Sequence, residues 1–139
     1  MTAPAPGAQA ARLYNRHGFE AFILDLAAVQ IVRQWGDASV GKIGGKVFAL
    51  YSDWSEKDQF QIAFKCSDIS FQMLGQLNGV RPARYLARAK WVEVMASSQL
   101  GESDLRDYIV EAHRLVASKL TMRVKDELGL TAARFKKKP

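Results

Sequence analysis

Basic residues collect at two places in this sequence, and both could contact the phosphates of a nucleic acid. Lys42 and Lys46 flank the dipeptide Gly44-Gly45, a pair typical of a tight turn between two strands. Segment 81–90 carries four more cations and no acidic residue. Such cations bind phosphates with an affinity that depends on salt and carries no information about base sequence. The residues predicted to bind DNA are Lys42, Lys46, Arg81, Arg84, Arg88 and Lys90.

Aromatic residues near the second cluster leave an alternative function open. Tyr85 or Trp91 could stack on an unpaired base, although Trp91 is interpreted first as a core residue. The alternative is a binding site for a small molecule or a protein partner in a groove between a sheet and its helices. Such a groove would be lined by Tyr85, Trp91 and His113.

The sequence contains no motif for catalysis or for tight metal binding. A nucleophile elbow, a P-loop and a dinucleotide-binding glycine motif are all missing. Neither His17 nor His113 has the spacing of a metal site. Asp104, Asp107 and Glu111 fall on one helical stripe, which is interpreted as a solvated face. We therefore expect no catalytic residue, no cofactor and no metal; a close polar pair inside a pocket would be needed to indicate an enzyme.

Cys66 is the single cysteine, so the chain cannot form an intramolecular disulfide, and a reducing compartment is expected. Its position before a predicted helix and next to Lys65 could lower the pKa of the thiol. No second cysteine is present for redox cycling. A buried, inert thiol is therefore predicted.

The net charge of +6 overstates the charge of the expected folded body. All 14 acidic residues lie between positions 17 and 133, whereas six of the 20 basic residues lie nearer the ends. These six are Arg12, Arg16, Arg134, Lys136, Lys137 and Lys138. The body is therefore close to neutral, and a basic surface on it requires local segregation of charge.

The elements that position these residues follow from the apolar pattern. Apolar residues at helical spacing predict a helix over 19–28, and the β-branched run after it predicts a strand over 29–35. Two apolar runs joined by Gly44-Gly45 predict a hairpin. Alternating apolar and polar residues predict a further strand over 59–65, after a turn at 55–58. Consecutive strands joined by tight turns form an antiparallel meander.

The second half of the sequence predicts more helix. Ser67 or Asp68 would cap a helix that reaches about position 76, and a strand is expected over 90–95. A long amphipathic helix should begin at Ser103. A shorter helix over 121–128 should end at Gly129.

This order of elements indicates an α+β fold, a two-layer sandwich with a twisted antiparallel sheet and helices packed on one face. We expect a flexible Ala/Pro-rich arm over 1–16, one domain over 17–130 and a basic tail over 131–139. The sequence has no apolar signal segment and no apolar run long enough to span a membrane. We therefore expect a cytoplasmic protein, with a monomer favoured over an oligomer.

Four segments, in this order, resemble the MmcQ/YjbR family: WGDASVGKIGGKVFAL, FKCSD, VRPARYLARAKWVEV and LRDYIVEAHRLVASKL. The resemblance covers about residues 18–128. It implies the fold of the bacterial frataxin CyaY and no established enzymatic activity. It also implies DNA binding for some members, through a pair of β-hairpin wings, and an unknown function for many.

The chain departs from the family pattern at two places. Ala28-Val29 stands where the family often has Pro-Gly, and Ala112-His113 stands where it often has Ser-Tyr. If the Ser-Tyr pair contributes to a family pocket, that pocket is altered here. The first predicted helix contains only Glu20 and Asp25 as acidic residues, so the iron binding of frataxins is not carried over from the shared fold.

Overall fold

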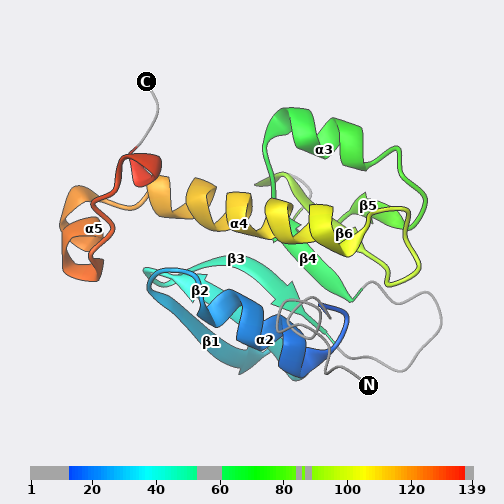
Figure 1. The fold of residues 1–139 in the computed structure, drawn as a ribbon, viewed down its shortest axis with the longest axis horizontal. Helices are drawn as coiled ribbons and strands as arrows, with labels where there is room; N and C mark the ends of the chain where they lie inside the picture. Colours follow the sequence, from blue (N-terminus) through cyan, green and yellow to red (C-terminus); the bar gives the residue numbers. More distant parts are fainter. Residues whose placement is uncertain (1–12, 53–60, 84–85, 87–88, 137–139) are drawn as a thin grey trace, which may run out of the picture.

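A six-stranded antiparallel sheet forms the centre of the molecule (Figure 1). The computed structural model describes residues 13–52, 61–83, 86 and 89–136. In that part the strands are β1 (Val29–Gln34), β2 (Ala38–Ile43), β3 (Lys46–Tyr51), β4 (Ile62–Lys65), β5 (Val80–Pro82) and β6 (Trp91–Val94). Their order across the sheet is β1-β2-β3-β4-β6-β5, and every neighbouring pair is antiparallel.

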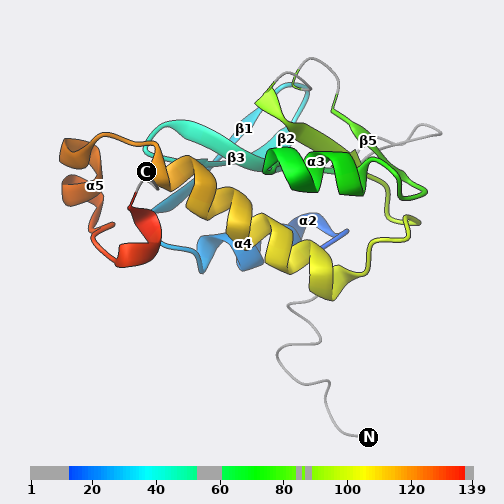
Figure 2. The same ribbon diagram turned by 90° about the horizontal axis from the view of Figure 1, so that it is seen from above.

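The helices form a second layer on one face of this sheet (Figure 2). They are α2 (Arg16–Leu24), α3 (Asp68–Leu74), α4 (Glu102–Ser118), α5 (Met122–Leu128) and the short 3₁₀ helix η2 (Ala133–Phe135). Buried side chains of α2, α3, α4 and η2 all belong to one core cluster. The predicted α+β sandwich with helices on one face is therefore confirmed.

The long helix α4 supplies the largest helical share of the core. Leu105, Ile109 and Ala112 recur at helical spacing, and none of them is exposed. Tyr108 on the same helix stacks on Phe64 of β4, with ring centroids 5.9 Å apart. Each fully buried Leu, Ile or Phe side chain contributes about 1.5–3 kcal/mol, so this stripe explains why α4 lies across the sheet.

Both turns of the β1–β2–β3 meander contain residues with a positive backbone φ angle. Gly44 and Gly45, at +58° and +79°, form the predicted two-residue turn, and strand β1 fills most of the predicted strand 29–35. Trp35 and Asp37 also have positive φ, which is uncommon for residues with a side chain. The predicted turn at 55–58 lies outside the described residues.

Two helix boundaries differ from the sequence-based prediction. Helix α2 begins earlier than expected, because the Asn15 side chain accepts a hydrogen bond from Gly18 N at 3.1 Å and caps it. It ends at Leu24 instead of Ala28, whose φ of +60° is incompatible with a helix. Helix α4 begins before Ser103, with Gly101 at the N-cap and no side-chain cap.

The centre of the chain also differs in part. Ser67 caps α3 as predicted, by accepting from Ser70 N at 3.1 Å, but the helix ends at Leu74, before the expected position 76. The short edge strand β5 was not predicted, because a three-residue strand containing proline has no clear sequence pattern. The predicted strand 90–95 is present as β6, and the helix 121–128 as α5, with Thr121 and Gly129 at its caps.

The packed body reaches beyond the predicted limits of 17 and 130. Leu13 is fully buried, and Phe135 is only 3 % exposed. Phe135 contacts His113 edge to face, with centroids 5.7 Å apart. The first part of the predicted basic tail is therefore anchored to α4. Within the described residues, no helix is both long and apolar enough to cross a membrane.

Candidate functional site

The β2–β3 turn holds the first pair of predicted DNA-binding residues. Lys46 is exposed and Lys42 is partly buried. A Cβ atom on Gly44 would lie 2.8 Å from Leu120 Cδ1 and 3.2 Å from Val124 Cγ1. The turn is therefore packed against the α4–α5 junction.

This packing brings the turn lysines to the same end of the molecule as the C-terminal basic residues (Figure 1). We call this region, which consists of residues 42–46 around the β2–β3 turn and residues 119–136, the basic end. Its described acidic residues are Asp126 and Glu127 alone. Its basic residues are Lys42, Lys46, Lys119, Arg123, Lys125, Arg134 and Lys136. Seven cations against two acids give a net charge of +5, although Lys125 is buried, with 5 % of its surface exposed. This region was not predicted, because the hairpin and the C-terminal segment are far apart in the sequence.

The second predicted cluster is partly neutralised. Arg81 Nε lies 2.9 Å from Glu93 Oε2, across the β5–β6 pair. The Lys90 ammonium lies 5.0 Å from the centroid of the Phe71 ring, a cation–π contact. The other members of this cluster, Arg84 and Arg88, and the aromatic residue Tyr85 lie outside the described residues.

Lys42 of the first predicted cluster and Arg81 of the second lie far apart on the sheet. Lys42 is on β2 and Arg81 is on β5, and the strands β3, β4 and β6 lie between them. Adjacent strands are about 4.8 Å apart, so the two strands are separated by roughly 19 Å across the sheet. A single contact surface would have to extend across most of the sheet.

Trp91 and His113, the two described residues of the predicted ligand groove, lie on opposite faces of the sheet and do not line one groove. Trp91 is 4 % exposed and packs in a small cluster with Ala63 and Ala83. His113 points from α4 into the main core on the other face and is 3 % exposed. The interpretation of Trp91 as a core residue is therefore confirmed.

His113 has a structural environment. Its Nε2 lies 2.8 Å from the carbonyl oxygen of Ala27; since a carbonyl only accepts, Nε2 carries the proton. The ring meets Phe48 edge to face, with centroids 5.3 Å apart. Burial lowers the pKa of His113, an effect partly offset by the bond to Ala27. The imidazole is therefore held neutral in the core.

Cys66 is buried, as predicted, with 3 % of its surface exposed. Burial raises the pKa of its thiol to about 11, although Lys65 acts in the opposite direction. Its Sγ lies 3.4 Å from the carbonyl oxygen of Lys90. The thiol is protonated at neutral pH and is not a ready nucleophile.

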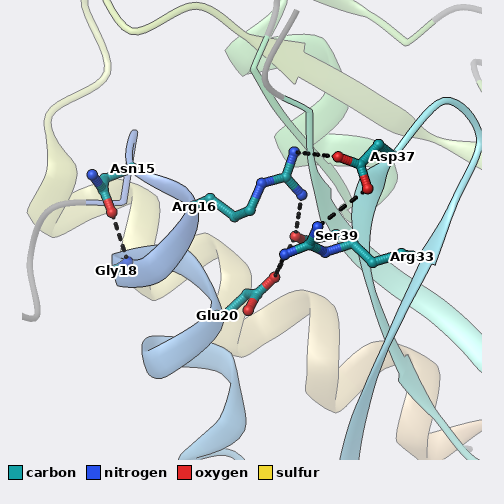
Figure 3. A network of polar contacts seen from close by, with 7 residues as sticks. All are labelled: Asn15, Arg16, Gly18, Glu20, Arg33, Asp37 and Ser39. Carbon is teal, nitrogen blue, oxygen red and sulfur yellow. Dashed lines mark hydrogen bonds and ion pairs between the residues drawn. The ribbon is translucent and has the colours of Figure 1, made fainter.

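A polar network that the sequence analysis did not anticipate joins α2 to the β1–β2 hairpin (Figure 3). Arg16 Nη1 donates to Ser39 Oγ at 2.7 Å, and Ser39 Oγ donates to Glu20 Oε2 at 2.5 Å. Arg33 contacts Glu20 at 3.3 Å and Asp37 at 3.2 Å. The two guanidinium groups balance the two carboxylates, so the network fixes α2 against the hairpin without adding net charge.

The Ser39–Glu20 pair is the close polar pair that could indicate an enzyme. An open, polar hollow of about 580 Å³ lies beside it, lined in part by Arg16, Glu20 and Arg33. However, Ser39 is fully buried, and its oxygen already bonds to both Arg16 and Glu20. A substrate in the hollow would not reach this hydroxyl without rearrangement.

Metal-ligating side chains are dispersed. Among the residues that the structure describes, no group of three or more His, Cys, Asp or Glu residues could hold a metal ion. Asp104, Asp107 and Glu111 instead line a groove on one side of α4.

The chain is similar to a known protein family and to a solved structure. The model of the YjbR family matches residues 24–115. The crystal structure of Deinococcus radiodurans protein DR2400, with a DUF419 domain, is similar, with a TM-score of 0.68 at 18 % sequence identity. The match covers 81 % of this chain and 86 % of that chain. No curated protein matches the chain.

Proposed function

Because the chain belongs to the YjbR family, as its sequence motifs indicated, we propose that it is a non-enzymatic binding protein that contacts the DNA backbone through its basic end. The observation that carries this proposal is the packing of Gly44 against Leu120 and Val124. It brings the hairpin tip that carries Lys46 to the basic C-terminal segment, and Lys42, the strand partner of Val47, lies on the other face of the same tip. Phosphates attract such a group of cations without base-specific contacts.

The charge of the basic end is well suited to this role. Arg123 has 88 % of its side chain exposed and is paired with Glu127 at 3.2 Å, an exposed pair that salt screens readily. Lys46, Lys119, Arg134 and Lys136 are exposed. The predicted wing residues Lys42 and Lys46 therefore act as part of a larger surface.

The second cluster contributes less to this surface. Arg81 already has a carboxylate partner in Glu93, and moving it to a phosphate would leave Glu93, whose side chain is 14 % exposed, without that partner. A role of Arg84 and Arg88 in DNA binding stays a prediction.

The test is fluorescence anisotropy of a labelled DNA duplex, and of the matching single strand, over a series of salt concentrations. Wild-type protein should bind at low salt, with a logarithm of affinity that falls linearly with the logarithm of salt concentration. The double variant Lys42→Gln/Lys46→Gln should reduce the duplex slope by about 1.8, since each lost phosphate contact removes about 0.9.

The variant Arg81→Gln/Lys90→Gln removes the same charge elsewhere and should leave the slope close to wild type. The corresponding variant of Arg84 and Arg88 tests the rest of that cluster. Absence of binding at low salt would refute DNA binding altogether. A slope unchanged in the hairpin variant would refute the role of the basic end.

A further inference from the structure

A groove of about 500 Å³ is lined by residues of α3, of α4 and of the segments next to them. Figure 1 shows α3 beside the first half of α4, away from α5 and the basic end. Its apolar lining comes from Met73, Leu74, Leu77, Leu100 and Tyr108. Its acidic lining comes from Asp104, Asp107 and Glu111, which follow one face of α4. The groove therefore combines an apolar floor with a row of carboxylates along one wall.

Met73 in the apolar lining of the groove, and its neighbour Ile69 on α3, are open to solvent. Met73 is 60 % exposed, and Ile69 is 72 % exposed one helical turn earlier on α3. Residues four apart in a helix lie on the same face, so these two side chains form one exposed strip. Large apolar side chains grouped in this way are a common feature of protein-binding surfaces. Methionine in particular adapts to different partner surfaces.

In the described part of the chain, few cations pair with these carboxylates. Glu111 is paired with Arg114 at 2.6 Å. No ion pair joins Asp104 or Asp107 to a cation in the described part of the chain, and both are exposed. From Asp104 to Glu111 the helix rises about 10 Å, or two turns. A partner with cations at matching spacing would find these two positions available.

We propose that this groove binds an amphipathic helical segment of a partner protein, about two to three turns long, with an apolar face flanked by Lys or Arg. Apolar side chains of the segment would lie against Met73, Leu77 and Tyr108. Its cations would face Asp104 and Asp107. This is the helix-in-groove form of recognition, in which anchors at i, i+3, i+4 and i+7 enter an apolar channel. Opposite charges along the rim set orientation and speed association.

The probe is a short fluorescent peptide of Leu and Lys residues arranged with helical period, and its counterpart has Glu in place of every Lys. Anisotropy should show binding of the Lys peptide and none of the Glu peptide. The variant Asp104→Asn/Asp107→Asn should weaken binding roughly five- to tenfold, because two rim charge pairs are lost. Met73→Ser should also weaken binding.

Matched controls separate this groove from general charge attraction. Asp25→Asn/Asp126→Asn removes the same charge from exposed positions elsewhere, and Met122→Ser changes another exposed methionine. Both should bind the Lys peptide like the wild type, and amide chemical shift changes should map to α3 and the first half of α4.

Equal weakening in the controls, equal binding of both peptides, or shift changes outside the groove would each overturn the proposal. Self-association in sedimentation that Met73→Ser abolishes would also overturn it, by assigning the groove to a second copy of the chain. None of these outcomes depends on DNA binding, so the test is independent of the function proposed for the basic end.

Discussion

His113 shows how a single residue can have two reasonable interpretations in a sequence. It lies on the apolar stripe of α4, where it could line a pocket or fill the core. The structure places it between Phe48 and Phe135, bonded to the Ala27 carbonyl. Both departures from the family pattern meet here, since Ala27 precedes the Ala28-Val29 pair. We infer that His113 fixes the connection between α2 and β1.

The buried imidazole predicts a specific dependence of stability on pH. Burial lowers the pKa of His113 from its usual 6.5 in the folded state, so the unfolded chain takes up a proton first as the pH falls. The contribution of the neutral imidazole to the free energy of unfolding is complete above pH 6.5. It is lost below that pH, at up to about 1.4 kcal/mol per pH unit. His113→Gln should remove this component from urea unfolding curves measured between pH 7.5 and pH 5.

The control is His17→Gln, which changes the other, exposed histidine and should keep the wild-type dependence on pH. At pH 7.5, His113→Ala should cost about 1–3 kcal/mol more than His113→Gln, because the glutamine amide still donates to the Ala27 carbonyl and alanine does not. A His113→Gln protein with an unchanged pH profile would show that the imidazole is not held neutral.

At the scale of elements, the β2–β3 turn joins the hairpin to the helical layer. Gly44 and Gly45 both need a positive φ, but only Gly44 lies against another element. A Cβ on Gly45 would meet nothing within 4 Å. The pair therefore separates the cost of backbone strain from the cost of packing against Leu120.

We predict that Gly45→Ala costs about 1–2 kcal/mol through left-handed backbone strain alone. Gly44→Ala should cost about 0.5–1.5 kcal/mol more, because Leu120 must leave its preferred rotamer. Chemical denaturation of both variants, repeated in a Leu120→Ala background, measures the difference. In that background most of the difference should disappear, with a small remainder from Val124 Cγ1 at 3.2 Å; an undiminished difference would mean that Leu120 is not the obstacle.

The sequence predicted elements better than it predicted surfaces. The spacing of Leu105, Ile109 and Ala112 was sufficient to identify α4, and Gly44-Gly45 was sufficient to identify a hairpin, because both signals are local. The pairing of Arg81 with Glu93 depends on the register of β5 against β6, which no local pattern encodes. The prediction that Trp91 and His113 share a groove was wrong, because the sequence does not show which face of the sheet each residue occupies.

At the scale of the whole molecule, charge is segregated although the predicted body is neutral. The basic end carries the β2–β3 turn and residues 119–136, whereas the acidic groove occupies the first half of α4. From Asp107 to Lys119 the chain rises about 18 Å along the α4 axis, beyond the Debye length of about 8 Å at physiological salt. The two surfaces can therefore attract ligands of opposite charge independently.

The extent of the folded body decides how the basic end can be tested. Phe135 is 3 % exposed and packs on His113, so Phe135→Ala should lower the free energy of unfolding by about 3–5 kcal/mol, as for other buried phenylalanines. Lys136→Ala, at an exposed neighbour, should stay within about 0.5 kcal/mol of wild type. Urea denaturation at pH 7.5 measures both, and a Phe135→Ala protein as stable as wild type would place the end of the body before this residue. If the loss is found, truncation after residue 130 removes core packing together with charge, so DNA binding must be tested by substituting individual lysines.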